Sequence, residues 1–157
     1  MKKTIALFTS ITCALVYACS VQAQLSVETL GVLRYDTSTY KKTWGAGADL
    51  GVKLNDFVTG HVRAVAYETD NWRGGAVDEV SALVEARLLQ SANKAVSLSA
   101  IGGVDYAIAS EAYGLSAGGR LAYSFSERFK AGIEARAQIM EGANVVLIPA
   151  AYLSLSF

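Results

Sequence analysis

The feature that most limits how this chain can fold is an alternation of apolar and polar side chains with a period of two, which recurs from about residue 25 onward. No stretch in this part sustains the apolar spacing of an amphipathic helix. Clusters of turn residues interrupt the alternation at intervals. The pattern predicts an all-β fold of eight strands, at residues 25–35, 44–54, 58–67, 77–89, 95–108, 115–125, 129–140 and 145–157.

The breaks between these strands differ in length. Those at 55–56, 91–94 and 126–128 are tight and have hairpin-turn compositions. The others, at 36–43, 68–76, 109–113 and 141–144, include longer connections. Tight and longer connections alternate along the chain, so each kind gathers at one end of the sheet. An even strand number also lets the last strand pair antiparallel with the first, which predicts an eight-stranded antiparallel up-and-down barrel without edges.

Charged residues fall on one phase of each predicted strand, and the opposite phase carries no charge except at strand ends. Opposite charges on neighbouring strands of a narrow barrel can neutralise one another, and we expect pairs of Arg120 with Glu134 or Asp105, and of Glu85 with Arg63. The charged set is Glu28, Arg34, Asp49, Lys53, Arg63, Glu79, Glu85, Arg87, Asp105, Arg120, Lys130, Glu134 and Arg136.

Period two alone does not say which face points inward. In one interpretation the barrel is soluble and periplasmic, and binds a small apolar ligand in its interior. In the other the apolar face meets lipid and the charges fill the lumen, as in a transmembrane β-barrel. The soluble interpretation would line its interior with the residues of the apolar phase, among them Leu50, Val52, Val62, Leu121, Ile133 and Leu153.

The aromatic residues favour the membrane interpretation. They gather near the two ends of the predicted strands, with mostly small and aliphatic residues between them, as in the aromatic girdles of membrane barrels. The predicted girdles are Tyr35, Trp44, Tyr67, Tyr106 and Tyr113 at the longer-loop end and Phe57, Phe125 and Phe129 at the tight-turn end.

The first 23 residues have the pattern of a secretory signal peptide: two lysines, an apolar run and a short polar stretch ending at Ala23. Cleavage there would leave one domain, 24–157, without cysteine, because Cys13 and Cys19 would be removed. A retained anchor helix and lipidation of Cys19 are the alternatives. Lys and Arg number 14, as do Asp and Glu, and no long block of one charge is present, which argues against nucleic-acid binding.

The end of the sequence, "AAYLSLSF", carries apolar residues at alternate positions before a terminal aromatic. Together with the signal peptide it resembles the assembly signal of the small eight-stranded bacterial outer-membrane β-barrel proteins, the class of the outer membrane protein A transmembrane domain and the X and opacity-like proteins. The resemblance implies a location in the bacterial outer membrane and recognition by the barrel-insertion machinery. The matching residues are Ala151, Leu153, Leu155 and Phe157.

No catalytic constellation is evident. The one histidine, His61, lies on the lumen-facing phase, and metal-ligand spacing and cofactor fingerprints are missing, so we expect neither an enzyme nor a cofactor. The sequence predicts a structural, monomeric outer-membrane barrel with a role in envelope integrity or minor surface recognition. Its partners would be lipid and lipopolysaccharide, the latter met by loop residues 40–42 and 72–73. A narrow ion-conducting barrel is a further alternative.

Overall fold

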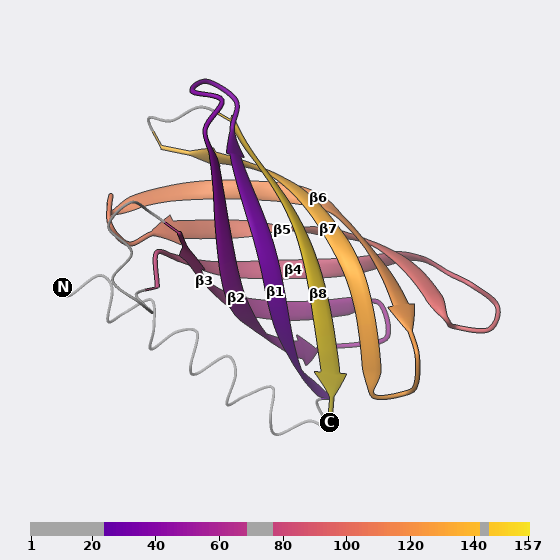
Figure 1. Ribbon diagram of the computed structural model, residues 1–157. Helices are drawn as coiled ribbons and strands as arrows, with labels where there is room; N and C mark the ends of the chain where they lie inside the picture. The colour runs from indigo at the N-terminus through magenta and orange to yellow at the C-terminus, as the bar shows by residue number, and fades with distance from the viewer. Residues whose placement is uncertain (1–23, 69–76, 142–144) are drawn as a thin grey trace.

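The computed structural model describes residues 24–68, 77–141 and 145–157. In these residues the chain forms one closed barrel in which each strand pairs with its neighbours in sequence (Figure 1). The predicted fold class and the eight strands are confirmed. The predicted signal peptide lies outside the described residues. The strands are β1 (Leu25–Asp36), β2 (Lys42–Lys53), β3 (Val58–Tyr67), β4 (Glu79–Gln90), β5 (Val96–Ala107), β6 (Ala112–Ser124), β7 (Phe129–Met140) and β8 (Val145–Ser156).

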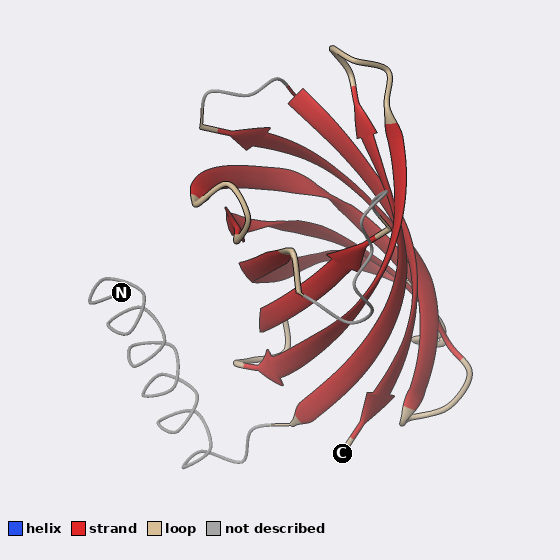
Figure 2. Ribbon diagram, turned by 60° about the vertical axis from the view of Figure 1, so that its left-hand side comes forward, coloured by secondary structure: helices blue, strands red, loops and turns tan. Residues whose placement is uncertain are grey.

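The barrel closes through antiparallel pairing of β8 with β1, which lie side by side in Figure 1. Figure 2 shows the barrel wall turned by 60°. Ser26 lies opposite Ser156, and the register continues through Glu28 opposite Ser154. The backbone N–H of Phe157 also donates to the carbonyl of Leu25, at 2.8 Å. Closure pairs the backbone groups that an edge strand would expose, which a sheet needs in order to cross a hydrocarbon layer.

The tight turns follow from short polar side chains that bond to the local backbone. The side-chain oxygen of Asn55 accepts hydrogen bonds from the N–H groups of Phe57 and Val58, both at 2.8 Å. Ser126 does the same for the N–H of Phe129, at 3.1 Å. These bonds satisfy backbone donors that the sheet leaves unpaired at its end. We call this end, where the β2–β3, β4–β5 and β6–β7 turns lie, the tight-turn end, and the opposite one the long-loop end.

The fourth strand, whose composition would also suit a helix, is a strand with one irregularity. The register with β5 shifts between Arg87 and Leu89, which marks a β-bulge. A bulge adds one residue to one strand and so interrupts the alternation of faces. As a result the consecutive residues Leu88 and Leu89 are both exposed, at 59% and 67%. The apolar pair therefore extends the outer surface near the tight-turn end.

The two faces of the barrel wall have the polarity of a membrane protein. Leu115, Ile133 and Leu153 on the outer face are 60–67% exposed, whereas Arg63 and Glu134 on the inner face are 1% and 3% exposed. The apolar interior expected for a soluble ligand-binding barrel is therefore wrong, because Leu121, Ile133 and Leu153 of its proposed lining are 45–63% exposed. Val52, at 4%, is the one buried exception among the residues named for it. No helix among the described residues is long and apolar enough to span a membrane.

Most predicted girdle residues are on the outer face, with one correction. Trp44 is 64% exposed near the long-loop end, and Phe125 and Phe129 are 66% and 56% exposed at the tight-turn end. Tyr67 instead points into the lumen and is only 4% exposed. It lies four residues after Arg63 on the same strand and so shares the inward phase of that arginine. The phase of a residue in its strand therefore predicts whether its side chain faces the lumen better than its distance from the strand end does.

The remaining predicted girdle residues are three outward-facing tyrosines and one phenylalanine on a turn. Tyr35, Tyr106 and Tyr113 occupy outward positions of their strands, and the rings of Tyr106 and Tyr113 lie 4.8 Å apart between centroids. Phe57 lies on the β2–β3 turn itself, 69% exposed, and borders the opening of the lumen. The long-loop end thus carries tyrosines and Trp44 outside, and the tight-turn end carries phenylalanines.

Candidate functional site

The candidate site is the barrel lumen, where the inward phases of all eight strands meet. Of the thirteen predicted lumen residues, eight are buried, namely Glu28, Asp49, Arg63, Glu79, Asp105, Arg120, Glu134 and Arg136. Arg34, Lys53, Glu85 and Arg87 are partly exposed, and Lys130 is exposed at the tight-turn end. The charged residues of the inward phase are therefore buried in the middle of the barrel, and those nearer its two mouths reach solvent.

Glu134 on β7 is the centre of the buried charges, and we call it and its three arginine partners the Glu134 hub. Arg63 from β3 donates two hydrogen bonds to the Glu134 carboxylate, at 2.6 and 2.9 Å. Nε of Arg120 on β6 lies 3.1 Å from Oε2, and Nε of Arg136 lies 2.7 Å from Oε1. Neither of these two Nε–H groups is aligned for a hydrogen bond. One carboxylate thus binds three guanidinium groups from three strands.

Further carboxylates surround the hub and take up the remaining guanidinium nitrogens. Arg120 contacts Glu28 at 2.5 Å and Glu85 at 2.6 Å, and its guanidinium lies 3.9 Å from the ring centroid of Tyr152. The expected neighbourhood of Arg120 and Glu134 is present. Glu85, however, pairs with Arg120 rather than with the Arg63 expected from sequence.

His61 joins this network on the side of β2 and β4. Its Nδ1 lies 2.9 Å from Asp49 Oδ1, and its Nε2 lies 3.2 Å from Glu85 Oε2. Glu28, Asp49 and His61 place one potential ligand atom each within 4.8 Å of one another. Arg63 already binds the second oxygen of Asp49, at 2.9 Å, and Arg120 binds Glu28. Guanidinium groups therefore occupy the carboxylates that a metal ion would need, and the arrangement supports an ion-pair network.

The lumen also contains an apolar layer that the sequence analysis missed. Leu30, Val32, Val65 and Ile148 are at most 4% exposed and belong to one cluster with Tyr67. The signal was present in the sequence, because Leu30 and Val32 alternate in phase with the charged residues on either side of them. The sequence analysis named only the charged members of this inward phase.

A second polar layer lies towards the long-loop end, around Glu79 at the start of β4. Glu79 is 1% exposed, and its nearest cationic partner is Arg34 on β1, 3.8 Å away. Neither carboxylate oxygen of Glu79 accepts a hydrogen bond of regular geometry, and the Gln138 side chain is its polar neighbour. Arg136 reaches this layer from below, since its Nη1 donates to Asp105 Oδ1 at 3.2 Å and to Ser116 Oγ at 3.0 Å. The contacts here are fewer and longer than those at the hub.

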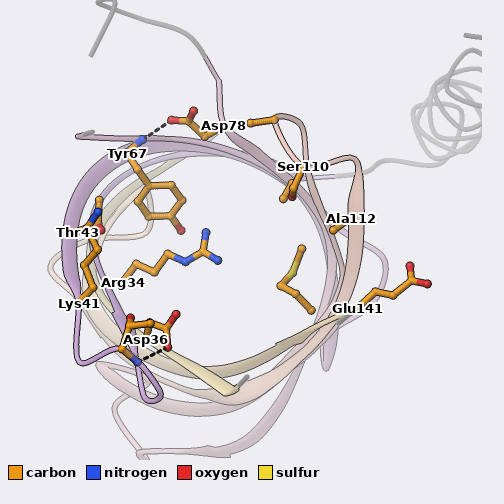
Figure 3. A pocket seen from close by; sticks show the side chains of 13 residues that line it. Arg34, Asp36, Lys41, Thr43, Tyr67, Asp78, Ser110, Ala112 and Glu141 are labelled. Carbon is orange, nitrogen blue, oxygen red and sulfur yellow. Dashed lines mark hydrogen bonds between the residues drawn. The ribbon is translucent and has the colours of Figure 1, made fainter. Parts of the chain in front are cut away.

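Two cavities lie on either side of the hub. The one at the long-loop end has a volume of about 440 Å³ and is lined by Arg34, Tyr67 and Met140, among others (Figure 3). The one at the tight-turn end has about 180 Å³ and is lined by residues that include Arg87 and Lys130. Side chains of the hub arginines are 1–2% exposed, so the hub closes the lumen between the two cavities.

The comparisons with known proteins concern the fold. No protein-family model matches the chain, and no curated protein matches it in sequence. The crystal structure of the N-terminal β-barrel domain of Pseudomonas aeruginosa OprF matches with a TM-score of 0.57 and 14% identity, over 87% of this chain and 100% of that one. The crystal structure of neisserial surface protein A matches with a TM-score of 0.60 and 14% identity, over 86% of this chain and 97% of that one.

A designed protein extends the comparison beyond natural sequences. A de novo designed transmembrane β-barrel matches with a TM-score of 0.61 and 11% identity, over 84% of this chain and 95% of that one. These similarities confirm the expected resemblance at the level of fold, to small eight-stranded transmembrane barrels. At such identities they carry the architecture and not the function.

Proposed function

We propose that this chain is a structural outer-membrane β-barrel whose outer face binds lipid and whose lumen is closed by ion pairs. The observation that carries the proposal is the inverted polarity of the wall, with leucine and isoleucine exposed outside and arginine buried inside. Large exposed apolar side chains lie on every strand except β3, and a surface of this extent would favour aggregation in water. In a bilayer it is the surface that hydrocarbon requires. The similarity to the OprF barrel domain and neisserial surface protein A supports the location.

The long-loop end would then face outward and meet lipopolysaccharide. Tyr40 and Lys41 are exposed on the β1–β2 connection, and Lys42 is exposed at the start of β2, near the outward Trp44. Lysine side chains pair with phosphate groups, and aromatic rings suit the membrane interface. The other predicted contacts, Trp72 and Arg73, lie outside the described residues. Integrity of the envelope is the role that such a closed, lipid-bound barrel supports best, with minor surface recognition as an addition.

The last strand would also guide insertion. Leu153 and Phe157 are 63% and 71% exposed, and together with Ala151 and Leu155 they occupy the outward positions of β8 and its end. An outward row of apolar residues ending in an aromatic side chain gives the barrel-insertion machinery an accessible surface before the barrel closes. A monomer and a non-enzymatic role complete the proposal, and the ion pairs of the Glu134 hub support the second, because they leave its charges bound to one another.

Ion conduction is the weaker hypothesis. Both cavities reach into the lumen, but the Glu134 hub lies between them, with three arginines held at 2.6–3.1 Å from one carboxylate. Opening a path would require these buried pairs to separate, which is costly for uncompensated charges. A planar bilayer recording with the purified barrel would test this, and we expect no steady conductance at neutral pH.

Membrane fractionation tests the main proposal. The full chain is expressed in a Gram-negative host, and the outer-membrane fraction is run on a denaturing gel with and without boiling. We expect the protein in that fraction with a mobility that changes only on heating, as for a detergent-resistant barrel. Recovery in the soluble periplasmic fraction would refute it. The mass of the purified protein decides between cleavage after Ala23 and lipidation at Cys19.

A matched pair of variants tests the insertion signal. Phe157→Ala removes an exposed outward aromatic ring, while Ser156→Ala changes the neighbouring inward residue, which is 5% exposed. We expect the first variant to lower the amount of heat-modifiable protein in the outer membrane and the second to leave it unchanged. The same variants refolded into detergent without the insertion machinery should both form barrels. Equal insertion of both variants in cells would contradict a role for the terminal residue.

A further inference from the structure

The layer around Glu79 holds a concentration of buried polar atoms without partners. Five side chains from strands β3, β4, β5 and β7 contribute to it, and each is at most 4% exposed. We call them the Glu79 cluster. The atoms that lack a hydrogen-bond partner are Oε1 and Oε2 of Glu79, Oγ of Ser81, Oδ2 of Asp105, Oη of Tyr67, and Oε1 and Nε2 of Gln138.

Strand register brings these side chains to one level of the lumen. Ser81 and Asp105 are direct partners across β4 and β5. Glu79 precedes Ser81 by two residues on the same inward face and lies opposite Val65, two residues before Tyr67. The cluster is therefore built by four neighbouring inward positions on three adjacent strands, and β7 closes it from the other side with Gln138.

The contacts around Asp105 and Glu79 leave specific oxygens free. Arg136 binds Oδ1 of Asp105 at 3.2 Å, and Oδ2 remains without a partner. Arg34 stays 3.8 Å from Glu79, beyond hydrogen-bond distance, and its guanidinium also lies 5.5 Å from the centroid of the Tyr67 ring. The nearby cations thus leave three carboxylate oxygens open towards the cluster.

Leaving these atoms unpaired would be costly. An ionised carboxylate buried without hydrogen bonds loses its hydration and regains little, and each further orphaned polar group costs about 1–3 kcal/mol. Buried groups without protein partners in native structures are therefore commonly satisfied by ordered water or by an ion. Ordered water or a cation would satisfy the oxygens that the register brings to this layer.

The charge of the lumen points to a cation. Between the two mouths the inner face carries the carboxylates of Glu28, Asp49, Glu79, Glu85, Asp105 and Glu134. The arginines that bind them are Arg34, Arg63, Arg120 and Arg136. The remaining bases of the inner face, Lys53, Arg87 and Lys130, line the cavity at the tight-turn end. The hub arginines already bind Glu134, so the shortage of cations is local to the Glu79 cluster, towards the long-loop end.

We propose that the Glu79 cluster binds a hard cation, with calcium as its physiological occupant. Apart from one amide nitrogen, the free atoms are oxygens from carboxylate, hydroxyl, phenol and amide groups, which are the donors that hard cations prefer. Calcium accepts six to eight oxygens in irregular geometry, whereas magnesium demands a near-ideal octahedron. A set drawn from four strands suits the more tolerant ion.

The ion has a route to this site. The cavity at the long-loop end is lined by Tyr67 and Arg34 and opens between the loops (Figure 3). In this view both side chains point into the barrel, with Tyr67 above Arg34, while Glu141 points away from the lumen. Movement of the half-buried Arg34 would expose the Glu79 carboxylate to the cavity. Calcium would enter from the side that faces outward in the proposed orientation.

Calcium-dependent stability tests the proposal directly. The full mature barrel is folded in a zwitterionic detergent without lipopolysaccharide, and the midpoint temperature of the gel-mobility change is measured in chelator and in a calcium series. We expect the midpoint to rise and saturate at calcium concentrations on the order of 10⁻⁴–10⁻³ M, the affinity range of extracellular calcium modules. Glu79→Gln should abolish the rise, and Glu141→Gln should keep it, because it makes the same chemical change at a side chain outside the cluster.

A second measurement does not depend on an altered carboxylate. Terbium replaces calcium in oxygen sites and luminesces when a tyrosine close to it absorbs light. We expect tyrosine-sensitised terbium emission that calcium competes away, and Tyr67→Phe should remove most of it. The proposal is overturned if calcium leaves the midpoint unchanged, or if Glu79→Gln responds like the unaltered barrel. A barrel that is heat-modifiable without any calcium response would refute the cation site while leaving the proposed structural function intact.

Discussion

Glu134 and Glu79 are two carboxylates on the same inner face, almost equally buried at 3% and 1% exposure, yet their surroundings are opposite. Glu134 touches three guanidinium groups at 2.6–3.1 Å. Glu79 has one cation, at 3.8 Å, and the Gln138 side chain as a polar neighbour. Burial alone therefore says little about the role of a charged residue in this lumen. The contacts around it separate a group that holds the barrel together from one that is open to a ligand.

The difference follows from where each residue lies. Glu134 is near the middle of β7, where Arg120 is its direct partner on β6 and Arg63 reaches it from β3 across the lumen. Glu79 is the first residue of β4, beside the wider cavity of the long-loop end. A network in the middle of a narrow barrel must be fully paired, because little water can compensate it. Near a mouth of the barrel, water or an ion from solvent can supply the partners that a buried polar group lacks.

The largest effect should come from breaking the hub. Glu134→Ala leaves three buried guanidinium groups facing one another, and we expect the free energy of unfolding to fall by about 3–5 kcal/mol. Urea titration of the barrel in detergent measures this. Glu127→Ala, on an exposed turn, should change stability by less than about 0.5 kcal/mol. A loss below about 1 kcal/mol for Glu134→Ala would show that the hub does not stabilise the fold.

The hub also depends on the close approach of β6 and β7, which two adjacent glycines test. A methyl group on Gly118 would contact the carbonyl of Ala135 and lie 2.7 Å from Cα of Arg136, both backbone atoms. On Gly119, which faces outward, its nearest neighbour would be 3.7 Å away. We expect Gly118→Ala to cost about 1–3 kcal/mol through overpacking, and Gly119→Ala to be tolerated. Equal unfolding midpoints for the two variants would contradict this strand geometry.

Glu79→Gln should have a much smaller effect on stability when measured in chelator. It replaces an uncompensated charge with a neutral group of the same shape, so we expect the free energy of unfolding to stay within about 1 kcal/mol or to increase. Glu134→Gln under the same conditions should cost more than Glu79→Gln. The comparison would fail if Glu79→Gln destabilised the barrel as much as Glu134→Gln does, since Arg34 would then be an effective partner.

The smallest effect should come from an exposed ion pair, which sharpens the contrast with the buried ones. Lys53 lies 2.9 Å from Asp56 on the β2–β3 turn, and its hydrogen bond lowers the pKa of the Asp56 carboxyl from the usual 3.8. A lowered pKa in the folded state gives stability that is present above the unfolded value and is lost as the pH falls through the folded one. We therefore expect a slight loss below about pH 3.8, absent in Asp56→Asn. NMR titration of the Asp56 carboxyl checks the direction of the shift, and high salt should weaken it.

The strands were predictable because period two depends on residues that are adjacent in sequence. The inner face was predictable for the same reason, since Asp49, Arg63 and Glu134 each fall on the charged phase of their own strand. Tyr67 was misplaced when its nearness to the strand end was given more weight than its phase. The apolar pair Leu30 and Val32 was missed because charges were taken as the whole content of the lumen.

The expected pair of Arg120 with Glu134 is present, since the two residues are direct partners on neighbouring strands. The other pairings could not be predicted, because they depend on how strands far apart in sequence are staggered around the barrel. Glu85 binds Arg120, 35 residues later, instead of Arg63 on the neighbouring strand. Arg63 reaches Glu134, 71 residues away, across the lumen. The Glu79 cluster is equally hidden in the sequence, because Gln138 joins it only when the barrel is closed. The sequence shows which residues face the lumen, but the stagger of the strands determines which of their side chains are in contact.

The pairing of β1 with β8 also has a consequence for the order of folding. Ser26 and Ser156 are partners, so the contact that closes the wall joins residues from opposite ends of the described chain. Contacts between such distant segments form slowly, and until they form, β1 has an exposed edge of the kind that aggregates. The seven preceding strands gain a complete wall only after β8 has been delivered. The chain must therefore remain protected from other chains through the whole of its transit to the membrane.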